Sequence, residues 1–420
     1  MNHARQHIAI IGSGISGMTA AYLLSRRHDV TVFEAADWVG GHTHTVDVEV
    51  QGKSWAVDTG FIVCNDRTYP NFLQLLGQIG VARRPSQMGF SVECERTGLA
   101  WAGGNLDQVF AQRRNLLSPS FIRMLRDILR FNRDAPALLD SRHGDFTLGE
   151  YLEMNRYSAM FRDYYILPMG AAIWSCGVDD MLDFPAHFFI RFFNNHGLLS
   201  ISNRPQWYVI EGGSRAYVEP LTRGFRDRIR LQTPVAAVQR DADGVNVLTE
   251  RHGTERFDSI VFACHSDQVL AILGDGATAD ERRVLGAIPY QENDVVLHTD
   301  TTMLPALRKT WSSWNYRLPK VAGDRVQLSY NMNILQSLAA PETFCITLNP
   351  GQPIDPARVL GRYTYHHPVY TLDGMKARAR KNDICGMHHT HYCGAYWHNG
   401  FHEDGVVSAL SVAAKFGERL

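Results

Sequence analysis

Short hydrophobic runs alternate with glycines and acidic residues at the start of the chain. Residues 8–11 are an apolar run that ends in Gly12, and residues 30–33 are a β-branched run that ends in Glu34. The segment between the two runs is helix-like and contains no proline. This pattern predicts a strand, a helix and a second strand, which together make a βαβ unit.

Three glycines after the first run stand where a dinucleotide-binding loop needs them. Gly12 lets the chain turn out of the strand, Gly14 lets backbone approach a pyrophosphate, and Gly17 lets the helix pack closely on the strand. The N–H groups at the start of the helix attract a diphosphate. About twenty residues further on, Glu34 is placed to accept hydrogen bonds from ribose hydroxyls. A glycine-rich turn that binds nothing is the alternative, but the whole unit favours a bound dinucleotide.

Later segments extend the same fold. Residues 40–43 read Gly-Gly-His-Thr, which allows backbone to pass close to a second part of a long cofactor. Residues 55–61 and 207–215 each predict a strand that leads into a glycine turn. Residues 258–264 predict a buried parallel strand because they are apolar on both faces. The nucleotide-binding domain is therefore expected to be discontinuous.

The middle of the chain predicts a second, substrate-binding domain. Residues 121–133 show helical periodicity with arginines interleaved, and residues 291–330 are strand-like. The aromatic block 188–197 is expected in the core, and the lining of a long apolar tunnel is the alternative. We expect a mixed sheet with helices over a cavity. The expected boundaries place 1–68, 205–290 and 381–420 in the nucleotide-binding domain, and 69–204 and 291–380 in the substrate domain.

Composition and charge narrow the possible partners. The chain of 420 residues has a formal net charge of -1, which argues against nucleic acid. No apolar run reaches the length of a membrane span. The arginines between 113 and 133 suggest peripheral contact with anionic lipid headgroups, with a solvated helix face as the alternative. The seven cysteines are scattered and odd in number, so we expect reduced, mostly buried thiols and a cytoplasmic protein, with contact at the inner membrane surface as a hypothesis.

Histidines cluster at 42–44, 366–367 and 388–391. Imidazoles at short spacing ligate zinc or iron. However, no carboxylate or cysteine stands at ligand spacing on an obvious helix face, and two of the clusters adjoin segments already assigned to the cofactor. We therefore predict no metal site.

The sequence resembles the superfamily of flavin-containing amine oxidases, protoporphyrinogen oxidases and phytoene desaturases. The resemblance rests on the loop 12–17, the pair Glu34-Ala35, the pair Gly40-Gly41, the segment 58–60 and the glycine-rich end 392–410. It implies an α/β protein of the amine-oxidase-like two-domain fold, with a Rossmann-like discontinuous FAD-binding domain and an α+β substrate domain. The positions that it implies for FAD are Gly12, Gly14, Ile15, Ser16, Gly17, Glu34, Ala35, Gly40, Gly41, His42, Thr43, Thr59, Gly60, Phe61, Val235, Ala263, Gly394, Phe401, His402, Glu403, Asp404 and Val406.

Longer patterns resemble one subgroup of that superfamily, namely residues 167–175, 193–199, 204–207, 364–368 and 400–405. Members of this subgroup occur beside cyclopropane-fatty-acid-synthase-like methyltransferases. The resemblance implies a fatty-acyl or phospholipid substrate and a lipid methyltransferase as partner. The resulting hypothesis is an FAD-dependent oxidoreductase that takes hydride from an apolar substrate onto flavin N5.

Three alternatives stay open. Amine oxidases of the superfamily commonly carry a lysine in the strand below the flavin, but residues 291–298 contain none, which weakens amine oxidation. A redox-neutral isomerase of acyl double bonds is the second alternative, and a flavin-binding partner without turnover is the third. The candidate catalytic residues are His298, Phe401 and His402.

Overall fold

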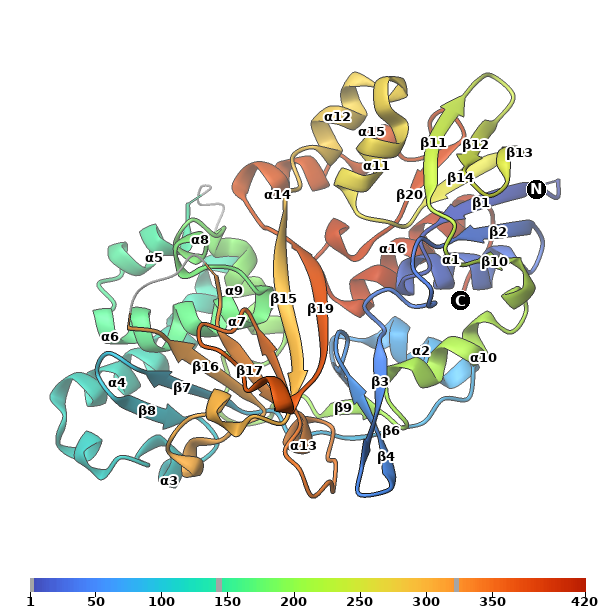
Figure 1. Cartoon of the computed structure of the whole chain (residues 1–420). Coiled ribbons are helices and arrows are strands. Elements are labelled where there is room, and N and C mark those ends of the chain that lie inside the picture. The colour runs from blue at the N-terminus through green and yellow to red at the C-terminus, as the bar shows by residue number, and fades with distance from the viewer. Residues whose placement is uncertain (1–3, 141–145, 321–324) are drawn as a thin grey trace.

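A computed structural model describes residues 4–140, 146–320 and 325–420 of the chain (Figure 1). Two sheets organise the molecule. In Figure 1 a small parallel sheet lies beside both chain termini on the right, and a larger mixed sheet carries helices on the left. The long strands β15 (Tyr290–His298) and β19 (Val359–Pro368) run between these two regions.

The first sheet has five parallel strands from distant parts of the chain. Its order is β10-β2-β1-β14-β20, and the strands are Ile229–Arg230, Asp29–Phe33, His7–Ile11, Ser259–Phe262 and Thr390–Tyr392. Ile11 pairs with Phe33 on one side and with Phe262 on the other, so their carboxyl ends lie together at one edge. The predicted βαβ unit and the predicted parallel strand in 258–264 are both confirmed.

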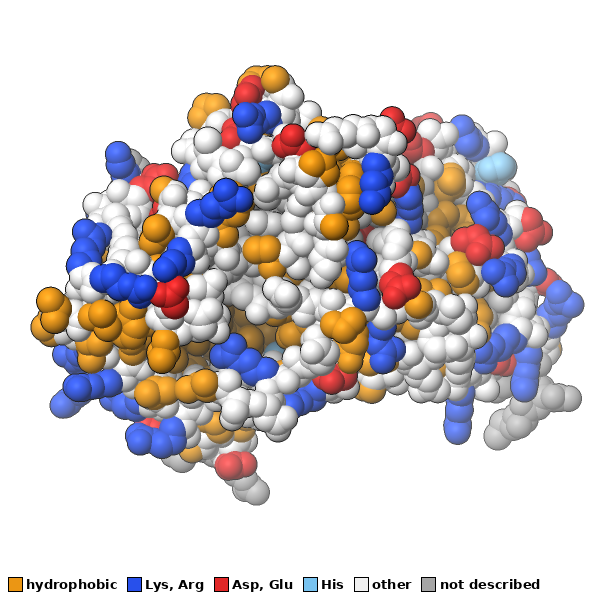
Figure 2. Space-filling model, turned by 90° about the horizontal axis from the view of Figure 1, so that it is seen from below, with side chains coloured by type: hydrophobic (Ala, Val, Ile, Leu, Met, Phe, Trp, Pro, Cys, Tyr) orange, Lys and Arg blue, Asp and Glu red, His pale blue; other side chains and the backbone are white. Residues whose placement is uncertain are grey.

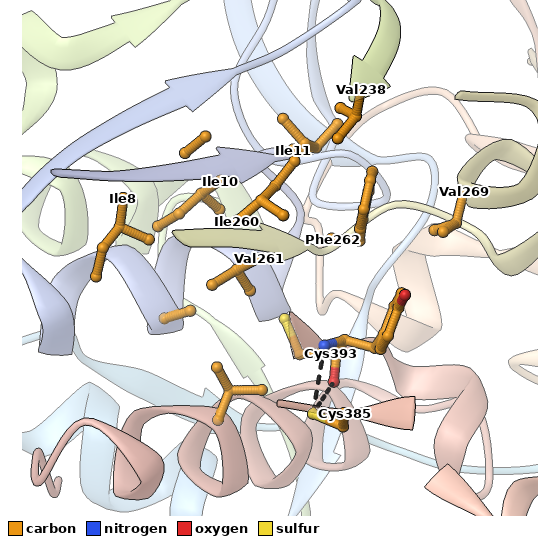
Figure 3. Close-up of a cluster of buried hydrophobic side chains, with 14 of the residues drawn as sticks. Ile8, Ile10, Ile11, Val238, Ile260, Val261, Phe262, Val269, Cys385 and Cys393 are labelled. Carbon is orange, nitrogen blue, oxygen red and sulfur yellow. Dashed lines mark hydrogen bonds between the residues drawn. The ribbon is translucent and has the colours of Figure 1, made fainter. Parts of the chain in front are cut away.

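Apolar side chains on both faces hold this sheet in place. Figure 3 shows Ile8, Ile10 and Ile260 between the strands and the surrounding elements, all fully buried. Helix α1 (Ile15–Leu24) packs against α16 (His402–Lys415), so the two ends of the chain meet beneath the sheet. All seven cysteines are free thiols, and six of them are buried, as the sequence predicted.

The second sheet has seven strands in the order β19-β15-β18-β17-β16-β7-β8. Only the pairing of β16 with β7 is parallel, so the sheet is mixed, as expected. The strand-like segment 291–330 contributes β15, β16 and most of β17. The remaining strands of this sheet are β18 (Cys345–Leu348), β17 (Leu328–Asn331), β16 (Trp314–Leu318), β7 (Phe90–Cys94) and β8 (Leu99–Ala102).

Helices cover this sheet through an aromatic core. Helix α4 (Pro119–Asp134) confirms the periodicity of residues 121–133, and α7 (Leu167–Trp174) and α9 (Ala186–Asn195) pack beside it. Phe188, Phe189 and Phe193 of α9 are buried. The aromatic block therefore forms core, as expected, and does not line a tunnel. No helix in the described ranges is long and apolar enough to cross a bilayer.

The seam between the two regions differs from the expected boundary at residue 69. Helix α2 (Pro70–Gln78) packs against α16, and its Phe72 and Leu76 share a core with Ile15 of α1. Strand β6 (Arg83–Pro85) pairs with β9 (Trp207–Ile210), which also pairs with β5 (Val63–Asn65). Residues 70–85 thus pack with the nucleotide-binding part.

Candidate functional site

The loop between β1 and α1 forms a backbone cradle at the carboxyl end of the parallel sheet. Gly12 has a φ of +101°, and a Cβ there would lie 3.1 Å from the carbonyl oxygen of Ala263. A Cβ on Gly17 would lie 2.0 Å from the carbonyl oxygen of Gly12, whereas a Cβ on Gly14 would meet no atom within 4 Å. Gly12 and Gly17 therefore allow the close packing, and Gly14 leaves open space at the helix N-terminus, where a diphosphate binds.

The carboxylate of Glu34 is fixed beside this loop. It accepts hydrogen bonds from the backbone N–H and the hydroxyl of Ser13, at 2.9 and 2.6 Å, and from the N–H of Ala36 at 2.9 Å. Oε1 has one of these partners and Oε2 has two, so acceptor capacity is left on Oε1. Glu34 also lines the large cavity described below. It can therefore accept a further hydrogen bond from a ribose hydroxyl.

The Gly40-Gly41 step brings His42 against the same loop. Both glycines have positive φ values, +130° and +57°, and a Cβ on Gly41 would lie 3.3 Å from the Cα of Gly14. The Nε2 atom of His42 is buried and has no hydrogen-bond partner among the described residues. Burial, with His265 and His366 nearby, lowers the pKa of His42 to about 3. His42 is therefore a neutral imidazole with an unused polar atom.

His402, at the start of α16, is held by a buried hydrogen-bonded group. Its Nε2 lies 3.1 Å from the hydroxyl of Thr43 and 3.0 Å from that of Tyr217. The ring stacks on Phe61 with 3.5 Å between ring centroids. Burial lowers the pKa of His402, so the imidazole is neutral and one of its two ring nitrogens carries no proton.

The two acidic residues at the start of α16, Glu403 and Asp404, have hydrogen-bond partners within the fold. Glu403 accepts from the N–H groups of Asn71 and Phe72 and so caps α2. Asp404 accepts from the N–H of Phe401 at 2.9 Å, which caps α16, and burial raises the pKa of Asp404 to about 6. Neither residue lines the cavity, and both carboxylates are taken up by these caps, so the expectation that they contact the cofactor stays a prediction.

His298, a candidate catalytic residue from the sequence, lies away from the cavity. It is fully buried at the end of β15, its Nε2 lies 2.7 Å from the hydroxyl of Thr347, and its Nδ1 accepts from the N–H of Asp300. Both ring nitrogens are therefore used within the substrate domain. His298 is not among the residues that line the cavity.

One cavity of about 1020 Å³ joins the cradle to the substrate domain. At one end lie Gly14, Glu34 and Val235, and at the other lie side chains of the seven-stranded sheet and α7. Of the 22 positions expected to contact FAD, those that line the cavity are Gly12, Gly14, Ile15, Ser16, Glu34, Ala35, Gly40, Gly41, His42, Thr59, Gly60, Phe61, Val235, Ala263, Gly394, Phe401 and His402. Gly17, Thr43 and Val406 act one layer behind it, in packing or hydrogen bonding.

Within the described residues, no group of three or more histidines, cysteines or carboxylates is arranged to hold a metal ion. The histidines at 42 and 366–367 line the cavity instead.

The family profile of flavin-containing amine oxidoreductases matches residues 15–305, which is more than half of the chain. The chain belongs to this family. Two L-amino-acid oxidases, from Notechis scutatus scutatus and Bungarus fasciatus, are 39% and 41% identical over 56 residues. These alignments cover 13% of this chain and 10% of each oxidase, so the chain matches about a tenth of the length of these curated relatives.

Several solved structures share the fold over nearly the whole chain. A candidate protoporphyrinogen oxidase from Exiguobacterium sp. 255-15 has a TM-score of 0.71 at 18% identity and covers 99% of both chains. A CLA-producing fatty acid isomerase from P. acnes has a TM-score of 0.70 at 16% identity, with 98% of both chains covered. Putrescine oxidase with bound putrescine has a TM-score of 0.69 at 15% identity, over 98% of this chain and 99% of that one.

The residues of this family member fit its cofactor, FAD. The open Cβ direction of Gly14 leaves space for the diphosphate, and Oε1 of Glu34 keeps acceptor capacity for a ribose. The unpartnered Nε2 of His42 lies on the same cavity wall and offers a further polar contact. FAD therefore fits a binding end that is built from N-terminal and C-terminal segments of the chain.

Sequence reasoning missed most of the cavity wall. The subgroup patterns 167–175 and 364–368 carried no assigned role, yet Trp174, Ser175 and the strand 364–368 line the cavity. Ser175 ends α7 in the left-handed conformation, with a φ of +54°, which is uncommon for serine. The hydroxyls of Tyr365 and Thr59 lie 2.8 Å apart and share a hydrogen bond, and the ring of Tyr365 packs on His42. The two adjacent histidines at 366–367 were the sequence feature that could have identified this part of the cavity wall.

Proposed function

We propose that this flavin oxidoreductase takes hydride from an apolar substrate, a fatty-acyl chain or a phospholipid. The observation that carries the proposal is the uncharged wall at the end of the cavity away from Glu34 and the glycine loop. The residues of this wall, which we call the apolar wall, are Ile62, Val63, Ile173, Trp174, Val295, Trp314, Tyr330, Leu335 and Leu348. Such a wall favours a ligand that has apolar surface to bury.

The charged residues Glu34 and Arg362 also line the cavity, but neither belongs to the apolar wall. Glu34 is held by Ser13 and lies at the dinucleotide end. Arg362 pairs across the sheet with Val296, whereas the adjacent Tyr363 pairs with Val295 of the apolar wall. Because neighbouring residues of a strand point to opposite faces, the Arg362 side chain is directed away from that wall. It forms an ion pair with Asp294 at 3.7 Å on the outer face.

The apolar wall offers no ionic partner to an amine or an amino acid. A protonated amine is held most strongly by a carboxylate, because burying an unpaired charge is costly, and the aromatic rings of the wall offer only the weaker cation–π attraction. An amino acid also needs a cation for its carboxylate. No lysine, and no carboxylate other than that of Glu34, lines the cavity within the described part of the chain. This supports a neutral, apolar reacting group.

Bound FAD supplies the hydride acceptor. The chain's own residues position and enclose the substrate. Phe61 and His402 form one rigid stacked pair, and Phe401 packs on Phe192 with 5.1 Å between ring centroids. These rings exclude water from the reacting bond, which strengthens the electrostatic interactions there. His402 is neutral and next to the cavity, so it is the candidate to accept the proton that the neighbouring carbon loses.

Anaerobic mixing tests the proposal. FAD-loaded protein is mixed with unsaturated fatty acids, with phospholipid dispersions, and separately with putrescine and L-amino acids, and the visible flavin absorbance is followed. We expect an acyl lipid to bleach the flavin and amines to leave it oxidised. Bleaching by amines or amino acids with no effect of any acyl lipid would show that the apolar-substrate proposal is wrong.

A matched pair of variants locates the effect. Ile173→Asn places an amide in the apolar wall at a partly exposed position, and Leu248→Asn makes the same type of change at an exposed site on β12 (Val245–Thr249) outside the cavity. The lipid concentration for half-maximal bleaching should rise about tenfold or more for Ile173→Asn only. Chromatography of the lipid then distinguishes an oxidised product from a shifted double bond.

A further inference from the structure

A short stretch of the substrate domain exposes an unusual number of leucines. Leu106, Leu116 and Leu117 have 77%, 52% and 88% of their surface exposed, and Leu129 has 53%. These four leucines fall within 24 residues of a chain that buries most of its large hydrophobic side chains. Single exposed leucines are ordinary on protein surfaces, but contiguous exposed apolar groups mark interaction sites.

Arginines without ion-pair partners accompany these leucines. Arg114, Arg123 and Arg126 are exposed, and none of them forms an ion pair with a described residue. Arg123 and Arg126 stand three residues apart on α4, and Leu129 is three residues further. Residues at this spacing share one helix face. That face of α4 is therefore cationic and partly apolar, and it is turned to solvent.

The leucines and arginines lie on one part of the surface. Leu116 and Leu117 end the turn η1 (Arg113–Leu117), which packs against the start of α4. Arg113 ties η1 to α3 (Leu106–Val109), because it donates to the carbonyl oxygen of Phe110 and pairs with Asp107. Figure 2 shows hydrophobic side chains gathered at the end of the molecule where α4 lies in Figure 1, with Lys and Arg side chains around them.

We propose that this surface docks the protein onto a lipid bilayer that contains anionic phospholipids. The residues of this surface, which we call the leucine–arginine face, are Leu106, Arg114, Leu116, Leu117, Arg123 and Arg126. The leucine tips enter the headgroup region, and the arginines bind lipid phosphates. The inference goes beyond the proposed function, because it depends on none of the residues that line the cavity.

Charge complementarity favours a bilayer over a second copy of this chain. In a symmetric dimer the same patch faces itself, so the unpaired arginines of both copies would be brought together. Like charges at close range oppose association. An anionic bilayer provides phosphates for each arginine and an apolar boundary for each leucine.

Co-sedimentation with vesicles tests the proposal on the FAD-loaded full chain. Vesicles of phosphatidylcholine alone are compared with vesicles of phosphatidylcholine and phosphatidylglycerol, at low and at high salt. We expect binding to the anionic vesicles that weakens with salt, and little binding to the neutral ones. The double variants Leu116→Ser/Leu117→Ser and Arg123→Gln/Arg126→Gln should each reduce the partition coefficient by about tenfold or more.

Control variants change an exposed aliphatic side chain and an exposed arginine elsewhere. Ile201→Ser alters a side chain that is 68% exposed, and Arg226→Gln removes an exposed positive charge, both outside the leucine–arginine face. Both controls should bind vesicles like the unchanged protein, and flavin absorbance reports that every variant is folded. The proposal is overturned if the unchanged protein ignores anionic vesicles, or if the double variants bind as tightly as the controls do. A concentration-dependent dimer that Leu116→Ser/Leu117→Ser abolishes, without vesicle binding, would also overturn it. Flavin bleaching by lipids in solution is a separate measurement, so either proposal can fail alone.

Discussion

The same substitution at two glycines of the β1–α1 loop should have opposite consequences. In Gly14→Ser the new side chain points into open space beside α1, since a Cβ there meets no atom within 4 Å. Gly14 is also the N-cap of α1, where serine is among the preferred residues. In Gly17→Ser the new Cβ would lie 2.0 Å from the carbonyl oxygen of Gly12. The first change therefore affects ligand binding, and the second affects folding.

The magnitudes follow from these contacts. Relief of the Gly17→Ser clash requires a movement of more than 1 Å, because ordinary contacts with a Cβ begin at 3.4 Å. Overpacking of this kind costs about 1–3 kcal/mol in the free energy of unfolding. A chain of 420 residues has an unfolding entropy of about 0.9 kcal/mol/K, so Tm should fall by about 1–3 °C. In Gly14→Ser the new side chain would fill space left for the diphosphate, and a loss equal to about two charge-assisted hydrogen bonds would weaken FAD binding by about 100-fold or more.

Two assays on the apoprotein separate the effects. Denaturant unfolding gives the stability of each variant, and titration with FAD followed by flavin fluorescence gives the dissociation constant. We expect Gly14→Ser to unfold like the unchanged apoprotein and to bind FAD weakly, and Gly17→Ser to unfold earlier. Equal loss of stability in both variants, or normal FAD affinity of Gly14→Ser, would refute the assignment of the loop as the diphosphate cradle.

Three further changes test the surroundings of the site. Tyr217→Phe removes one of the two hydroxyls that hold Nε2 of His402, and it should lower the free energy of unfolding by about 1–2 kcal/mol, measured in urea; an unchanged midpoint would contradict this hydrogen bond. His298→Ala should lower the free energy of unfolding by about 2–4 kcal/mol in the same assay and leave the FAD dissociation constant unchanged. Weakened FAD binding with normal stability would instead show that His298 acts at the cofactor site. Burial raises the pKa of Asp404 from 3.8 to about 6, so the native state binds a proton more tightly than the unfolded state does. The stability that protonated Asp404 contributes is therefore present below pH 4 and is lost as the pH rises to about 6. Asp404→Asn stays neutral at every pH. The difference in the free energy of unfolding between the unchanged protein and this variant, measured by denaturant titration, should therefore change by about 3 kcal/mol between pH 4 and pH 6. A difference that does not depend on pH would contradict the raised pKa.

The dinucleotide end could be predicted from sequence because its signals are local. Gly12, Gly14 and Gly17 lie within one loop, and Glu34 ends the next strand, so their meeting follows from one βαβ unit. The same reasoning did not give the direction of the Glu403 side chain, only one residue past the cavity-lining His402. Successive residues of a helix point about 100° apart, so Glu403 turns towards α2 and caps it. A motif therefore identifies the segment and leaves the direction of each side chain undetermined.

The arginines of the leucine–arginine face were visible in the sequence, but the apolar wall and the exposure of the leucines could not be predicted in this way, because both depend on long-range packing. Val295 and His298 lie on the same strand, but an odd separation puts them on opposite faces, and only the pairing of β15 with β19 shows which face meets the cavity. The mixed sheet that decides this face is closed by strands from residues 90–102 and 314–368, far apart in the chain. The alternating pattern of β15 permitted either orientation, so the sequence alone could not show that His298 lies on the face away from the cavity. Arg123 and Leu125 pose the same problem on α4, where only the aromatic core beneath determines that Arg123 faces solvent. The local sequence motif thus locates the cofactor. Which residues meet the substrate, and which form the leucine–arginine face, depends instead on the faces of strands and helices that packing leaves uncovered.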